Sequence, residues 1–108
     1  MKLCICSGGH TRSVALARAF QGPAIAVGIN RCEPDKFLIL LLLADEIHIC
    51  CRLDKTEERI VYTANKKTFD HTNLMPEDIW GTPTHPDLIE ICNKIVAMRW
   101  QDWVVKYE

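Results

Sequence analysis

Residues 1–20 of this chain are MKLCICSGGHTRSVALARAF, and this stretch decides the fold. The apolar run in Lys2–Cys6 predicts a short central strand, because strands covered on both faces carry few polar residues. Ser13–Phe20 predicts a helix, with serine and threonine available as caps just before it. Two adjacent glycines lie between these elements. The order is therefore strand, glycine-containing loop, helix.

A thiol and a guanidinium stand at the two ends of this loop. Cys6 begins it, and Arg12 and Ser13 end it at the start of the helix. Backbone N–H groups of a tight loop at a helix N-terminus attract anions, and an arginine fork suits phosphate. The same positive field favours the thiolate form of Cys6, which is the nucleophilic form. The stretch therefore predicts an oxyanion-binding loop that contains a nucleophile.

The pattern Cys6-x5-Arg12-Ser13 after an N-terminal strand resembles the phosphate-binding loop of the low-molecular-weight protein tyrosine phosphatase family. The resemblance extends over the chain, but only the loop is specific. Gly9 stands where the family usually has asparagine, and Val14 where it often has proline. The resemblance implies a hydrolase, a phosphatase that forms a phosphocysteine intermediate. Its substrate would be protein phosphotyrosine or a small phosphorylated molecule, with no cofactor and no metal.

The loop residues have specific roles in this interpretation. Cys6 would attack phosphorus, Arg12 would hold two oxygens of the transferred group, and Ser13 would donate its hydroxyl to the Cys6 sulfur. The expected phosphate-binding residues are Ser7, Gly8, Gly9, His10, Thr11 and Arg12. Both glycines are expected to adopt positive φ and to let the backbone approach the ligand. The structural alternatives are a buried cysteine, a solvated arginine and an ordinary helix cap, and His10 could also simply face solvent.

A leaving group needs a proton, which the family takes from an aspartate in a late loop. The best match is Asp78, although the proline that usually follows that aspartate is absent. Asp70 is the second choice, and Asp87 is expected to be a charge at a helix start. Trp80 is then expected to line the substrate site, or alternatively to anchor the loop to the core.

The rest of the chain predicts alternating strands and helices. Further strands are expected at Ala24–Ile29, Glu46–Cys51 and, weakly, Lys67–Thr72. Further helices are expected from near Glu33 to Leu43, at Leu53–Ala64 and at Asp87–Trp103. Such alternation predicts an α/β fold with a parallel sheet covered on both faces. The resemblance implies a flavodoxin-like, three-layer domain over residues 1–108 with a four-stranded sheet of order 2-1-3-4, where ligands bind at the carboxyl edge.

Size and composition restrict the function classes. The chain has 108 residues, 48% of them hydrophobic, enough for one domain with one core. A net charge of -1 argues against nucleic-acid binding. No signal peptide or membrane-spanning run is apparent, so a cytoplasmic protein without a membrane partner is expected. The six cysteines lack paired Cys-x-x-Cys motifs, which argues against a zinc ribbon.

Two further functions and one further partner stay open at this point. The chain could bind a phosphorylated ligand without catalysis, using the same loop. It could also be an arsenate reductase, if Cys50, Cys51 or Cys92 served as redox partners of Cys6 rather than as small core residues. The aromatic C-terminal segment, which contains Trp100 and Trp103, could pack on the sheet or form a homodimer contact.

Overall fold

The structure is a computed structural model that describes residues 1–98, and within this range four strands alternate with four helices. The strands are β1 (Lys2–Cys6), β2 (Ala24–Gly28), β3 (Glu46–Ile49) and β4 (Lys67–Asp70). The helices are α1 (Arg12–Ala19), α2 (Pro34–Leu43), α3 (Lys55–Thr63) and α4 (Pro86–Ala97). The expected alternation of strands and helices is confirmed.

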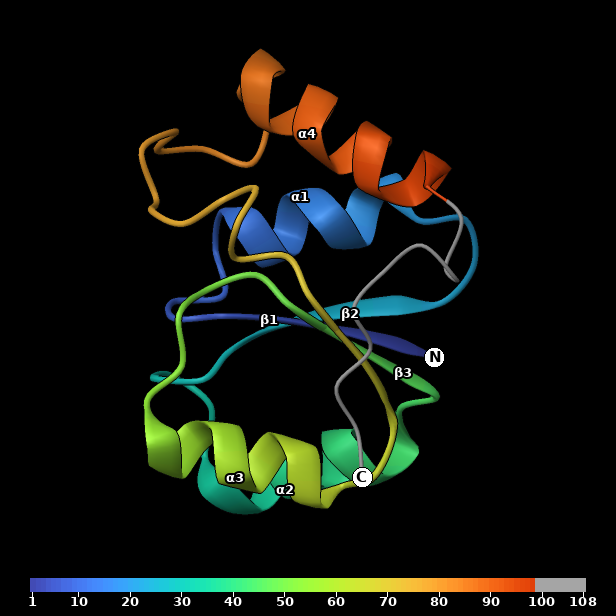
Figure 1. Ribbon diagram of the computed structural model, residues 1–108, viewed down its shortest axis with the longest axis vertical. Helices are drawn as coiled ribbons and strands as arrows, with labels where there is room; N and C mark the ends of the chain where they lie inside the picture. The colour runs from blue at the N-terminus through green and yellow to red at the C-terminus, as the bar shows by residue number, and fades with distance from the viewer. Residues whose placement is uncertain (99–108) are drawn as a thin grey trace.

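All strand pairs are parallel, and the order across the sheet is β2-β1-β3-β4. Figure 1 shows α1 and α4 on one face of this sheet and α2 and α3 on the other. The expected flavodoxin-like topology is therefore confirmed. No helix within residues 1–98 is long and apolar enough to cross a bilayer.

The two-residue period of β1 divides the core into two layers. Leu3 and Ile5 pack with the buried side chains of α2 and α3. Cys4 and Cys6 point to the opposite face, where they join the buried residues of α1 and α4. The last residue of β1 therefore carries its thiol toward the first turn of α1.

Two expected helix boundaries are wrong, each for a local reason. The predicted start of α3 at Leu53 moves to Lys55, because Asp54 caps the helix by accepting a 2.8 Å hydrogen bond from the Glu57 backbone. The predicted end of α4 at Trp103 moves to Ala97, because Met98 adopts an extended backbone with φ -68° and ψ 148°. Residues 99–108, and with them the aromatic segment, lie outside the described residues.

The strands also end earlier than expected. The predicted second strand ends at Gly28 rather than at Ile29, and the third ends at Ile49 rather than at Cys51. Both strands still make one more backbone hydrogen bond to β1 beyond their last residue. The amide of Ile29 donates to the Cys6 carbonyl oxygen at 2.8 Å, and the amide of Cys50 donates to the Ile5 carbonyl oxygen at 2.7 Å. These extensions run at the carboxyl edge of the sheet, where the loop after β1 begins.

Candidate active site

The sulfur of Cys6 lies in a buried polar environment at the end of β1. The backbone N–H of Gly9 donates to Sγ at 3.1 Å, and the hydroxyl of Ser13 lies 3.0 Å from the same atom. Ser13 is fully buried and Cys6 is 3% exposed. The Gly9 N–H is thus one donor to the sulfur, and the Ser13 hydroxyl can act as a second donor when the sulfur accepts. Ser13 lies inside α1 and touches the sulfur, and Thr11, the N-cap, makes no side-chain capping hydrogen bond within residues 1–98.

The loop after Cys6 is held against the end of β2 by direct backbone packing. Gly9 has φ +72°, and a Cβ built there would lie 2.5 Å from the Gly28 nitrogen. Conversely, a Cβ on Gly28 would lie 2.3 Å from the carbonyl carbon of Gly8. Both positions therefore require glycine, and the sequence interpretation missed Gly28, whose only signal was a glycine closing an apolar strand.

Gly8 differs from the expectation. The glycines with positive φ within residues 1–98 are Gly9, Gly22 and Gly81, so the expected positive φ at Gly8 is wrong. A Cβ at Gly8 would meet only side-chain atoms, at 3.7 Å from His10 and 3.9 Å from Arg31, which is ordinary contact. The backbone of Gly8 packs closely against Gly28, although Gly8 itself does not adopt a positive φ.

Strand-like hydrogen bonding continues into the first residues of the loop. The amide of Asn30 donates to the carbonyl oxygen of Ser7 at 3.0 Å. The carbonyl of Ser7 therefore points toward the segment after β2. The other expected loop residues differ in exposure: Thr11 is buried, Ser7 is half-buried and His10 is exposed. Within residues 1–98 the side chain of His10 makes no hydrogen bond or ion pair, as expected for a residue that faces solvent.

Arg12 places a positive charge inside the protein, and no carboxylate of residues 1–98 forms an ion pair with it. It is the first residue of α1 and 6% exposed. Its Nη1 donates to the carbonyl oxygen of Met75 at 3.0 Å, while Nε has no hydrogen-bond partner among the described residues. The helix dipole disfavours a cation at this end, and a buried unpaired charge is costly. The arrangement therefore favours an anion beside Nε of Arg12.

The candidate acids lie in three different environments. Figure 1 shows the segment between β4 and α4, yellow to orange, on the same side of the molecule as the loop after β1. Asp78 is exposed in this segment, three residues after the acceptor of Arg12, and its carboxylate makes no hydrogen bond within residues 1–98. Asp70 accepts from the backbone and hydroxyl of Thr72 at 2.9 and 2.6 Å and is committed to that turn.

The remaining two residues of this segment also differ in environment. Asp87 lies in the first turn of α4, where it is exposed, as expected for a charge at a helix start. Trp80 is half-buried and packs against the core layer that contains Cys6. This packing favours a role for Trp80 in anchoring the segment to the core.

The other thiols of this layer are core residues. All six cysteines are free, and Cys4, Cys50, Cys51 and Cys92 are buried. Burial raises the pKa of Cys51 to about 11 and the pKa of Cys92 to about 12. These protonated thiols are poor nucleophiles toward a sulfur, which disfavours the arsenate reductase interpretation. No group of three or more His, Cys, Asp or Glu side chains within residues 1–98 is arranged to hold a metal ion.

Comparisons of this chain with protein-family models, with curated proteins and with solved structures found no match.

Proposed function

We propose that this protein is a cysteine-dependent phosphomonoester hydrolase of the low-molecular-weight protein tyrosine phosphatase type. One observation carries the proposal. The sulfur of Cys6 lies 3.1 Å from the Gly9 N–H and 3.0 Å from the Ser13 hydroxyl, and the loop that starts after it leads to a buried Arg12 whose Nε lacks a protein partner in residues 1–98. A nucleophile and an anion cradle in one loop suit attack on a bound phosphoryl group.

The reaction takes two steps. In the first, the Cys6 thiolate attacks phosphorus in line, a P–S bond forms, and the P–O bond to the leaving group breaks. Asp78 donates a proton to the departing oxygen. In the second, water attacks phosphorus as the Asp78 carboxylate accepts its proton, and the P–S bond breaks to release phosphate and the thiolate. Ser13 donates its hydroxyl to the sulfur whenever it is negatively charged.

Arg12 supplies the electrostatic stabilisation. The guanidinium is already anchored by Nη1 on Met75, so its remaining N–H donors, Nε included, keep a fixed direction. Donors that need no reorganisation are worth more to the transition state than mobile ones. The loop and Arg12 thereby stabilise the negative charge on the three equatorial oxygens of the transferred phosphoryl group.

The proposed substrate is protein phosphotyrosine or a small phosphorylated molecule, and the proposed compartment is the cytoplasm. Six free cysteines, five of them buried, fit a reducing compartment. Trp80 beside Asp78 offers an aromatic surface for a ring of the substrate. No cofactor is required by this chemistry.

A second function is favoured by the position of Asp78. Its exposed carboxylate makes no hydrogen bond in the described part of the chain, so nothing there fixes it over the loop. A protein that keeps the cradle without a positioned acid would bind a phosphorylated ligand and turn it over poorly.

The test is hydrolysis of an aryl phosphate together with trapping of the intermediate. Wild-type protein quenched in acid during turnover should carry a phosphoryl group on Cys6 by mass spectrometry. Cys6→Ser should abolish both turnover and trapping, whereas Cys32→Ser, at the half-buried thiol outside the loop, should change neither. Iodoacetate at about pH 6 should label Cys6 before the other thiols, with protection by phosphate. Tight phosphate binding without turnover would instead support the non-catalytic function.

A further inference from the structure

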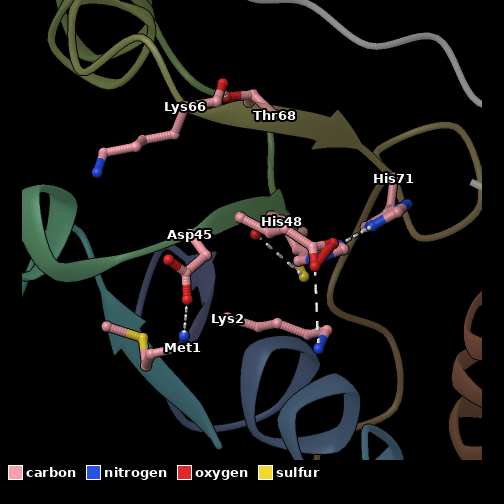
Figure 2. A network of polar contacts seen from close by, with 9 residues as sticks. Met1, Lys2, Asp45, His48, Lys66, Thr68 and His71 are labelled. Carbon is pink, nitrogen blue, oxygen red and sulfur yellow. Dashed lines mark hydrogen bonds and ion pairs between the residues drawn. The ribbon is translucent and has the colours of Figure 1, made fainter.

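Two buried histidines form a hydrogen-bonded pair in the sheet. His48 lies in β3 and His71 directly follows β4, and both are at most 1% exposed. Nδ1 of His48 lies 2.8 Å from Nε2 of His71, with ring centroids 5.1 Å apart. Figure 2 shows the two side chains joined across neighbouring strands. The pair therefore links the carboxyl ends of β3 and β4.

Both imidazoles are neutral at ordinary pH. Burial lowers the pKa of His48 to about 2, with the charge of His71 as a smaller cause, and lowers the pKa of His71 to about 4. A neutral pair can share one hydrogen bond, in which one ring donates and the other accepts. The rings of Phe20 and Phe69 pack on His48 at centroid distances of 4.7 and 5.1 Å, which fixes the orientation of that ring.

The backbone of His71 continues from this pair into the segment between β4 and α4. Its N–H donates to Ile49 O at 2.9 Å, which extends the pairing of β4 with β3. Its carbonyl oxygen accepts from the amides of Leu74 and Met75 at 3.0 and 3.3 Å. This turn places Met75, whose side chain is fully buried and whose carbonyl oxygen accepts the Nη1 of Arg12 at 3.0 Å.

We propose that His71, held by its hydrogen bond to His48, is a positioning residue for Arg12. The side-chain bond fixes the turn from His71 to Met75, and the Met75 carbonyl oxygen in turn fixes Nη1 of the guanidinium. The role in catalysis rests on the function proposed above, whereas the effect on the guanidinium itself does not. Sequence patterns could not suggest this role, because it passes through a backbone carbonyl 63 residues from Arg12.

Two variants of His71 distinguish a specific hydrogen bond to His48 from the mere presence of a polar side chain at this position. His71→Gln keeps a polar atom near the position of Nε2 and can still reach His48, whereas His71→Asn is too short and places its amide near Nδ1. Val61→Ala, in the opposite core layer, is the control for lost stability. The readouts are the arginine side-chain NMR signals of the unliganded protein, the Kd for inorganic phosphate, and kcat and KM for an aryl phosphate.

In His71→Asn the Arg12 guanidinium signals should broaden and shift, and the Kd for phosphate should rise about tenfold or more. The ratio kcat/KM should fall about a hundredfold, the scale of a 1 Å misplacement. His71→Gln should stay within about threefold of wild type, as should Val61→Ala at matched loss of stability.

Equal Arg12 signals and phosphate affinity in the Asn and Gln variants would overturn the positioning role, while wild-type turnover would leave the proposed function standing. Absence of turnover in the wild type would refute the hydrolase, and the NMR comparison would still decide the positioning role. Failure of the His71→Gln variant to fold would also overturn the positioning role, because the histidine pair would then be needed for stability of the core alone.

Discussion

The contact between the loop and the end of β2 leads to a sharp prediction for Gly28→Ala. The added Cβ would lie 2.3, 2.5 and 2.6 Å from the Gly8 carbon, the Gly8 oxygen and the Gly9 nitrogen. Ordinary contact begins at 3.4 Å, so relief of the shortest contact needs 3.4 − 2.3 = 1.1 Å of movement. All three atoms are backbone, and no side chain can rotate away. Because β2 is paired along its length, the loop must move instead.

The expected cost follows from this displacement. Overpacking of this kind destabilises a protein by about 1–3 kcal/mol. A shift of about 1 Å in the cradle should also lower kcat/KM by about a hundredfold. The Sγ–N contact of Gly9, now 3.1 Å, would lengthen and weaken the stabilisation of the thiolate.

The assay combines urea unfolding with iodoacetate labelling of Cys6 and its protection by phosphate. Gly8→Ala is the matched control, because its Cβ would meet only side-chain atoms at 3.7 and 3.9 Å. Gly28→Ala should label more slowly and lose phosphate protection, and Gly8→Ala should behave nearly as wild type. Wild-type labelling and stability in Gly28→Ala would refute the claim that β2 sets the position of the loop.

Three further predictions concern charge and protonation. Arg12→Lys keeps the charge but loses the two-pronged guanidinium, and kcat/KM for an aryl phosphate should fall by an amount that corresponds to several kcal/mol of lost transition-state stabilisation. An unchanged kcat/KM would place Arg12 outside the site. Asp78→Asn should slow cleavage of esters with basic leaving groups by about a hundredfold and affect good leaving groups much less, while a loss at Asp70→Asn instead would show that the acid is misassigned. Burial lowers the pKa values of His48 and His71 to about 2 and about 4 from 6.5, so the unfolded chain binds protons first as the pH falls. The free energy of unfolding should therefore drop below about pH 6.5, by about 2 kcal/mol for each imidazole at about pH 5; a flat urea midpoint between about pH 7 and pH 5 would contradict neutral burial of the pair.

The sequence predicts the sheet well, because alternating strands and helices leave few topologies for a chain of this length. It also predicts that Cys6 and the pair Arg12 and Ser13 flank one short loop, because the loop joins the strand that ends at Cys6 to the helix that begins at Arg12. The partners that complete the site were not predictable in this way. Gly28 acts by lacking a side chain, and Met75 acts through a carbonyl oxygen that every residue possesses.

The end of α4 shows a different limit. Helical spacing of apolar residues continued to predict a helix beyond Ala97, but the backbone turns extended at Met98. Periodicity reports which face of a segment can be buried, and it carries little information on where the last turn stops.

The hydrogen bond between Arg12 and Met75 also bears on the order in which parts of the protein fold. The two residues are 63 positions apart, so the guanidinium cannot be anchored until the segment that contains β4 and Met75 has been synthesised and folded. Contacts of such long separation form late, after the cost of closing the loop has been met by other pairings. An emerging or truncated chain would thus carry Cys6 without its finished cradle. Capture of an anion by the loop should consequently serve as a reporter of completed folding, well suited to stopped-flow measurements of the final assembly step.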